Sequence, residues 1–261
     1  MAEKIASFSR VVPGAKAGVI IVHGIAEHKG RYLDFINRLE AVGISVFAPD
    51  LRGHGESFGA RGDVEKFQDY LDDLDTFVRR VRAGNPELKL ALFGHSMGGL
   101  IAAVYAGTES TIDALVLSSP AVERRWYLAI LKLLPTWILR RVKIKKYWSE
   151  SKAMMNAAQT DPLGVMHFTL RLIRESFVVG VARAAATMKN IRVPVLVVGG
   201  VGDAMTHDLD GVLATVSSAD KTLRIYERAI HRVVQNAAAD EAIPDIIAWV
   251  NSKTSDAEQG G

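Results

Sequence analysis

The sequence contains no cysteine, which excludes disulfide bonds, thiolate metal sites and cysteine nucleophiles. This absence fits the reducing cytoplasm, where we expect the protein to reside. No uninterrupted apolar run reaches the roughly 18 residues that a membrane-spanning helix needs. The N-terminal residues lack the basic, apolar and small-residue regions of a signal peptide. We therefore expect a cytoplasmic protein whose contact with membranes, if it makes any, is peripheral.

Hydrophobic residues make up 49% of the 261-residue chain and charged residues 23%, a balance typical of one packed globular protein. Short apolar runs alternate with longer amphipathic stretches, which predicts an α/β fold with a mainly parallel central sheet flanked by helices. The predicted strands are residues 18–23, 44–48, 88–94, 112–118, 193–199 and 222–226. The predicted helices lie near residues 31–42, 64–83, 97–107, 207–216 and 239–252.

One stretch interrupts this alternation. Between residues 121 and 190 we find no convincing strand, only apolar and basic sequence of helical character. The stretch falls between the fourth and fifth predicted strands, and ligands of open α/β sheets bind at the carboxyl ends of the strands. We therefore expect a helical cap, or lid, at residues 121–190, and a core formed by residues 1–120 and 191–261.

A nucleophile motif follows the third predicted strand. Residues 94–98 read Gly-His-Ser-Met-Gly, and a helix-like stretch comes directly after them. In a G-x-S-x-G turn the serine takes a strained conformation that presents its hydroxyl above the sheet, and the flanking small residues let strand and helix approach closely. The motif predicts Ser96 as a nucleophile, supported by Gly94, His95 and Gly98.

A serine hydroxyl needs a base to accept its proton, and that imidazole needs a carboxylate to orient it. His231 is the only histidine after the last predicted strand, which places it at the same sheet edge as Ser96. Asp203 follows the fifth predicted strand in a glycine-rich loop. Asp208 and Asp210 are alternative acids, although we expect them on the following helix. The predicted catalytic triad is Ser96, Asp203 and His231.

Two backbone N–H groups are expected to stabilise the oxyanion of the reaction. One is predicted at Met97, the residue after the nucleophile. The other is predicted at Ile25, in the loop after the first predicted strand, where His23 and Gly24 support it.

Six segments read VHGIAEHKGRY, APDLRGHGESFGARGDV, FGHSMGGLIAA, LSSPAV, TDPL and KTLRIYERAIH. Together they resemble the monoacylglycerol lipase and lysophospholipase-like family of α/β hydrolases, and the likeness runs from about Val19 to Val250. The resemblance implies the α/β-hydrolase fold, hydrolysis of an acyl ester through an acyl-enzyme, and the triad and oxyanion donors given above. It also implies no metal or organic cofactor, and a helical cap that shields an apolar acyl channel.

The resemblance further implies roles for several supporting residues. Residues 50–57 would brace the oxyanion loop, with His54 supportive rather than catalytic. Glu27 and His28 would order the same loop. The chain departs from the family at Arg232, which follows the base where an acidic residue is common.

Residues 124–149 hold eight Lys or Arg and no Asp or Glu, a local charge of +8 that leaves −5 on the rest of the chain. They include Trp126, Trp137 and Trp148, and an α-helix is expected to end before Pro135. Basic residues beside tryptophan and leucine are typical of a helix on an anionic lipid surface, so we expect peripheral membrane contact. The alternative is that the apolar face covers the core and the charges are merely solvated. No nucleic-acid-binding motif accompanies the basic residues, so we expect no nucleic-acid partner.

The leading interpretation is a serine carboxylic ester hydrolase, similar to monoacylglycerol lipases, that cleaves monoacylglycerol or a related single-chain lipid ester. Lysophospholipase or broad carboxylesterase activity is an alternative. A non-catalytic ligand receptor on a hydrolase scaffold is another, because folds and sites are reused. An aminopeptidase would need acidic cap residues to hold a free amino group, and the basic segment argues against that.

Overall fold

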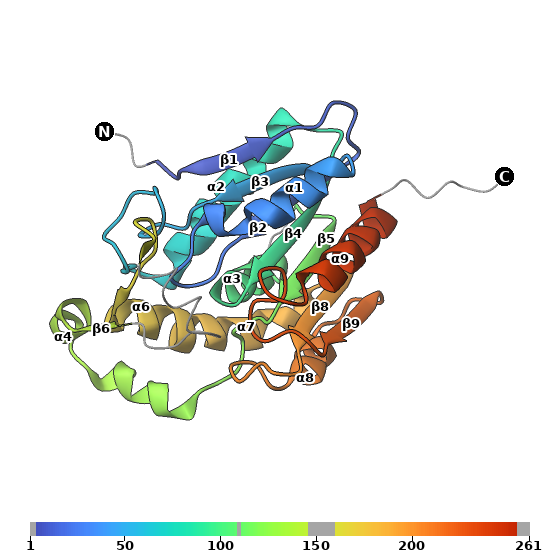
Figure 1. The fold of residues 1–261 in the computed structure, drawn as a ribbon. Helices are drawn as coiled ribbons and strands as arrows, with labels where there is room; N and C mark the ends of the chain where they lie inside the picture. The colour runs from blue at the N-terminus through green and yellow to red at the C-terminus, as the bar shows by residue number, and fades with distance from the viewer. Residues whose placement is uncertain (1–3, 109–110, 146–159, 255–261) are drawn as a thin grey trace.

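The computed structural model describes residues 4–108, 111–145 and 160–254. Its central sheet consists of β1 (Ser7–Arg10), β2 (Ala17–Val22), β3 (Ser45–Pro49), β4 (Lys89–His95), β5 (Ala114–Ser118), β8 (Val195–Gly200) and β9 (Lys221–Tyr226). The strand order is β1-β3-β2-β4-β5-β8-β9, and all neighbours are parallel except β1 and β3 (Figure 1). The prediction of a mainly parallel sheet flanked by helices is confirmed.

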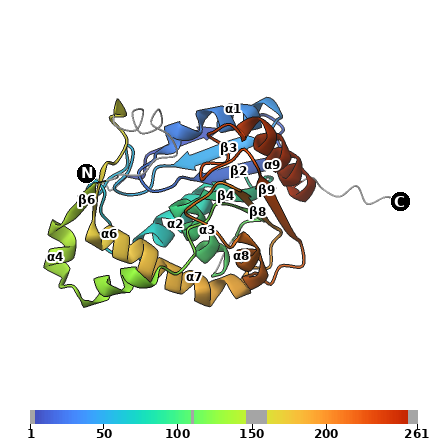
Figure 2. The same ribbon diagram turned by 60° about the horizontal axis from the view of Figure 1, so that its bottom comes forward.

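Helices cover both faces of the sheet (Figure 2). One face carries α1 (Leu33–Ala41) and α9 (Ala239–Thr254), and the other carries α2 (Phe67–Gly84), α3 (Met97–Ala106) and α8 (Leu209–Thr215). Along β2, Val19 and Ile21 pack on the α1 side, whereas Ile20 and Val22 pack on the α3 side. Both faces are therefore buried, which explains why the parallel strands read as continuous apolar runs.

The antiparallel edge strand β1 is not among the predicted strands. Its four residues alternate between exposed serines and the partly buried Phe8 and Arg10. Such a strand has no continuous apolar run, because one of its faces meets solvent. Arg10 fixes it to α1 by donating a hydrogen bond to Asn37 over 3.1 Å.

The segment between β5 and β8 departs from two expectations. It contains η2 (Trp126–Leu133), α4 (Thr136–Arg141), β6 (Lys143–Lys145), β7 (His167–Thr169), α6 (Leu170–Arg174), the π-helical η3 (Glu175–Gly180) and α7 (Val181–Thr187). The expectation of no strand here is wrong, because β6 and β7 pair antiparallel; three residues each are too few to give a periodic pattern. Residues 146–159, including Trp148, lie outside the described residues.

The helix before Pro135 ends where expected, but it is a 3₁₀ helix rather than an α-helix. With three residues per turn, Tyr127, Ile130 and Leu133 share one face, and all three are exposed. Leu131 lies on another face and is buried. The apolar residues are therefore divided between the interior and the solvent.

The most apolar helix lies entirely within the fold. All ten residues of α3 are buried, and this length is about half of what a membrane span requires. None of the helices within the described ranges is long and apolar enough to cross a membrane.

The loop after β3 encloses the buried side chain of His54. Burial, and next the proximity of His23, lower the pKa of His54 to about 3. The two rings lie 5.5 Å apart. Leu51 N–H donates to His23 Nε2 over 2.9 Å, so this loop is bonded to the one that follows β2.

We expect His54 to make the protein labile in acid. Between its folded pKa of about 3 and its ordinary value of 6.5, only the unfolded chain binds a proton at His54, so stability falls as the pH falls through this window. Lowering the pH from 7.5 to 5 should cost ~2 kcal/mol of unfolding free energy through this residue alone. Urea unfolding at the two pH values measures the loss, which should be smaller by this amount in His54→Gln.

The exposed His207 provides the matched control. His207→Gln should keep the pH dependence of the wild type. If His54→Gln had the same pH dependence of stability as the wild type, His54 would not be a source of the acid lability.

Candidate active site

Ser96 occupies the sharp turn between β4 and α3. Its φ of 53° and ψ of −116° lie where non-glycine residues are rarely found. A Cβ on Gly98 would collide with the carbonyl oxygen of Val22, and a Cβ on Gly94 would come within 2.5 Å of the carbonyl oxygen of Gly98. Strand and helix therefore approach as closely as they do only because both positions are glycine.

The structure brings the three predicted triad residues together. The distance from His231 Nε2 to Ser96 Oγ is 2.8 Å, and that from His231 Nδ1 to Asp203 Oδ2 is 2.9 Å. All three residues are buried, at 9% exposure or less. The alternative acids Asp208 and Asp210 lie at the start of α8, and neither is bonded to His231 in the described structure. The geometry suits proton transfer from Ser96 to an imidazole oriented by a carboxylate.

Asp203 is held in its ionised form. Burial alone would raise the pKa of Asp203, but hydrogen bonds from His231, from the Thr206 hydroxyl and from Met205 N–H outweigh it and hold the pKa well below its ordinary value. A carboxylate that keeps its charge at neutral pH can stabilise a positive imidazolium next to it.

The loop after β2 packs directly against the nucleophile turn. A Cβ added to Gly24 would lie 3.4 Å from Ser96 Cβ and 3.2 Å from His95 Cδ2, so only glycine fits comfortably there. Ile25 lines the same cavity as Ser96. The N–H groups of Ile25 and Met97, the predicted oxyanion donors, donate no hydrogen bond within the described ranges.

Buried Glu27 joins this loop to the loop that carries His231. Its carboxylate accepts hydrogen bonds from Gly24 N–H (3.1 Å), the Tyr32 hydroxyl (2.7 Å) and Arg232 Nε (2.7 Å). Burial raises the pKa of Glu27, but the charge of Arg232 and the hydrogen bonds from Arg232 and the Tyr32 hydroxyl hold it below its ordinary range. Sequence reasoning misses this ion pair, and its one clue is the unusual arginine after the predicted base.

His95, which lies next to the predicted base, is itself uncharged. Its ring lies 4.9 Å from that of His231. Burial above all lowers the pKa of His95 to about 3, so the ring is neutral at physiological pH. Protonation of His231 during a reaction therefore meets no second imidazolium at this position.

A cavity of about 450 Å³ opens at Ser96 and His231. Its polar lining residues are Glu123, Arg125 and Thr206. Its other walls are apolar or aromatic and consist of Ile25, Ala121, Tyr127, Leu128, Ile144, Ile173, Phe177 and Met205. Such a mostly apolar pocket with a few polar groups is typical of a small-molecule site.

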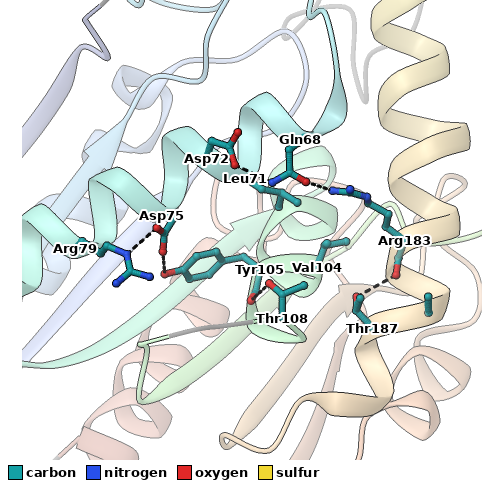
Figure 3. Close-up of a pocket in the computed structure, with 11 residues that line it drawn as sticks. Gln68, Leu71, Asp72, Asp75, Arg79, Val104, Tyr105, Thr108, Arg183 and Thr187 are labelled. Carbon is teal, nitrogen blue, oxygen red and sulfur yellow. Dashed lines mark hydrogen bonds and ion pairs between the residues drawn. The ribbon is translucent and has the colours of Figure 1, made fainter.

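A second cavity, of about 480 Å³, lies between α2, α3 and α7 and shares no lining residue with the first (Figure 3). Its polar groups bond to one another: Asp75 accepts from the Tyr105 hydroxyl (3.3 Å) and from Arg79 Nε (2.7 Å). Within the described ranges, no three His, Asp or Glu side chains are grouped so as to hold a metal ion. The cavity at Ser96 is therefore the candidate active site.

Comparison with known proteins identifies the family. The family model described as serine aminopeptidase, S33 (Hydrolase_4) matches residues 13–237. The chain belongs to this family. Members differ in the activities for which they are named, so the family name does not by itself specify a substrate.

Several proteins that resemble this chain over most of its length are named as lipases. A monoglyceride lipase of Mus musculus is 29% identical over 94% of this chain and 86% of its own. A monoacylglycerol lipase of Mycolicibacterium smegmatis is 30% identical over 90% of this chain and 88% of its own. The crystal structure of Paleococcus ferrophilus monoacylglycerol lipase has a TM-score of 0.83 at 26% identity, covering 96% of this chain and 99% of that one. These findings confirm the predicted resemblance and the α/β-hydrolase fold, and they indicate a carboxylic ester hydrolase.

We expect Glu27→Gln to slow ester hydrolysis roughly tenfold to a hundredfold, because the loop after β2 then loses its charged bond to Arg232 and shifts relative to Ser96. The rate should be measured on a soluble p-nitrophenyl ester, as kcat and KM separately. The loss should appear in kcat, since misplaced oxyanion donors stabilise the transition state less but affect the binding of the ester little.

The exposed pair Arg38–Asp240 provides a control of the same charge type. Asp240→Asn removes one carboxylate that does not line the cavity and should leave kcat unchanged. A Glu27→Gln enzyme with the kcat of the wild type would show that the buried pair has no part in positioning the site.

Proposed function

We propose that the protein is a serine hydrolase that cleaves monoacylglycerols or similar single-chain acyl esters through an acyl-enzyme. The observation that carries this proposal is the continuous contact of Ser96, His231 and Asp203 at the wall of a mostly apolar cavity. The similarity to lipases of single-chain glycerides supports the choice of substrate.

In the first half of the reaction, Ser96 Oγ attacks the acyl carbonyl carbon while His231 Nε2 takes the hydroxyl proton. The carbonyl oxygen becomes an oxyanion, to which we assign the N–H groups of Ile25 and Met97 as donors. His231 then gives the proton to the leaving alcohol oxygen as the ester bond breaks, and the acyl group remains on Ser96.

In the second half, His231 takes a proton from a water molecule that attacks the acyl-enzyme. The attack forms a tetrahedral intermediate on Ser96. When this intermediate breaks down, His231 returns the proton to Ser96 Oγ and the fatty acid is released. Asp203 stays ionised throughout and stabilises the imidazolium formed in each half.

We assign residues 121–190 to a cap over the site, and residues 1–120 and 191–261 to the hydrolase core. Leu128, Ile144 and Phe177, all from the proposed cap, line the cavity that opens at Ser96. An acyl chain among such side chains gains about 0.8 kcal/mol per buried methylene, so these residues would set chain-length preference.

We also propose that the cap docks on anionic membranes. On its described surface Trp126 is 82% exposed, Leu133 81% and Trp137 62%. Basic residues alternate with these apolar ones along the sequence, and four of them on α4 and β6 are exposed: Arg140, Arg141, Lys143 and Lys145. Aromatic and basic side chains presented together are the pattern of a surface that lies on lipid.

The proposed chemistry makes Ser96 the site of covalent labelling. A fluorophosphonate probe should label the wild type and fail to label Ser96→Ala. Hydrolysis of a monoacylglycerol by that variant should fall by about 10⁶, as when the nucleophile of a serine hydrolase is removed. Gel fluorescence and fatty-acid release measure the two effects.

Ser252 is an exposed serine on α9 that does not line the cavity at Ser96, and Ser252→Ala should label normally. A wild type that neither labels nor hydrolyses any acyl ester would overturn the proposal and favour a ligand receptor. Labelling together with a strong preference for short water-soluble esters would instead indicate a broad carboxylesterase.

Reversing the four exposed basic residues of α4 and β6 to glutamate should weaken vesicle binding by at least a hundredfold at low salt, since each contributes about 1 kcal/mol at an anionic surface. Co-sedimentation with vesicles of phosphatidylglycerol and phosphatidylcholine measures the partition coefficient.

A second variant controls for net charge by reversing four basic residues elsewhere: Lys16, Arg80, Lys89 and Lys221. It carries the same total charge as the first variant and should bind vesicles nearly as well as the wild type. Equal loss in both variants would mean that overall charge, rather than the cap surface, governs the binding.

A further inference from the structure

We infer that Arg125 is a specificity residue that binds a phosphate group on the leaving alcohol, which makes anionic lysophospholipids a substrate class of this site. The inference rests on the proposed ester hydrolysis at Ser96. It starts from one feature of the cavity, a charged side chain in a mostly apolar wall.

Arg125 lines the cavity together with Ser96 and His231. In the part of the chain that the structure describes, its hydrogen-bond partners are uncharged: Nη2 donates to the Met205 carbonyl (2.8 Å) and Nη1 to the Tyr127 hydroxyl (3.2 Å). No carboxylate lies within ion-pair distance of it in these same ranges. Four other arginines of the fold each have such a partner: Arg52, Arg171, Arg174 and Arg232. The guanidinium keeps its full charge and has donors left for an anion.

Glu123, the other charged residue of the wall, is engaged elsewhere. One of its carboxylate oxygens accepts hydrogen bonds from the backbone N–H groups of His207 and Asp208. Its charge is therefore partly satisfied by the chain that leads into α8. Among the described residues that line the cavity, Arg125 is the one arginine or lysine that could meet an anionic ligand.

A series of hydrogen bonds connects Arg125 to His231 through Met205 and Asp203. Met205 N–H donates to Asp203, and Asp203 in turn is bonded to His231. The imidazole delivers its proton to the leaving alcohol oxygen, so the head group lies beside His231 rather than among the apolar side chains that would take the acyl chain. A phosphate on that head group meets the planar donors of a guanidinium, which bind phosphate in a bidentate manner.

The charge of Arg125 distinguishes head groups that carry a phosphate from those that do not. Hydrogen bonds to an ionised group contribute more to binding than those between neutral groups. A head group without a phosphate, such as glycerol, gains no comparable contact with Arg125. The site should therefore cleave both substrates, with the charged one depending on this side chain.

The experiment compares two esters of the same acyl chain, a monoacylglycerol and a lysophosphatidic acid, both with an octanoyl chain so that they stay monomeric and membrane docking plays no part. We expect the wild type to cleave both. In Arg125→Gln, kcat/KM for the phosphate ester should fall at least tenfold more than for the glycerol ester. Arg125→Lys should recover part of this difference, because it restores the charge without the planar donors.

Arg228 provides the matched control, since it is exposed, lies three residues before His231 in the sequence and does not line the cavity. Arg228→Gln should leave the ratio of the two kcat/KM values within twofold of the wild type.

Equal losses of kcat/KM on both esters in Arg125→Gln would overturn the inference. They would mean that Arg125 only stabilises the backbone at Met205. A wild type that cleaves the glycerol ester but not the phosphate ester would also overturn it, while leaving the proposed function intact. Failure to cleave either ester would instead count against the proposed function itself.

Discussion

The close packing of β4 against α3 is the constraint on which the rest of the site depends. Gly94 and Gly98 let β4 and α3 approach closely. The carbonyl of Val22, at the end of the neighbouring strand β2, leaves no room for a side chain at Gly98. This contact fixes Ser96 in a strained backbone conformation, and buried sheet and helix on either side stabilise it. The loop after β2 and the imidazole of His231 are then placed against that turn.

The parallel strands could be predicted because burial on both faces leaves a local record in the sequence. Residues 88–94, for example, anticipate β4 to within one residue. The strands β1, β6 and β7 left no such record, since each is three or four residues long and depends on a distant partner. The 3₁₀ form of η2 was also out of reach, because apolar residues fill most of its positions and periods of 3.0 and 3.6 then look alike.

Sequence order alone placed Ser96, Asp203 and His231 near one another, because each follows a strand that ends at the same edge of a parallel sheet. The Glu27–Arg232 pair could not be found in this way, since its members lie 205 residues apart and belong to no common motif. Arg125 was one of many cations in a basic run. Only the fold distinguishes it, by turning it toward the cavity while Arg140 faces solvent.

The backbone of Met205 serves two neighbours at once: its N–H binds the acid Asp203, and its carbonyl binds Arg125. A substitution at position 125 therefore removes a hydrogen bond from the same backbone residue that binds Asp203. Descendants of this protein that adapt to a different head group by exchanging Arg125 would alter turnover in the same step. Adaptation through a wall residue such as Phe177 would leave that linkage untouched, which makes acyl-chain preference the easier trait to diversify.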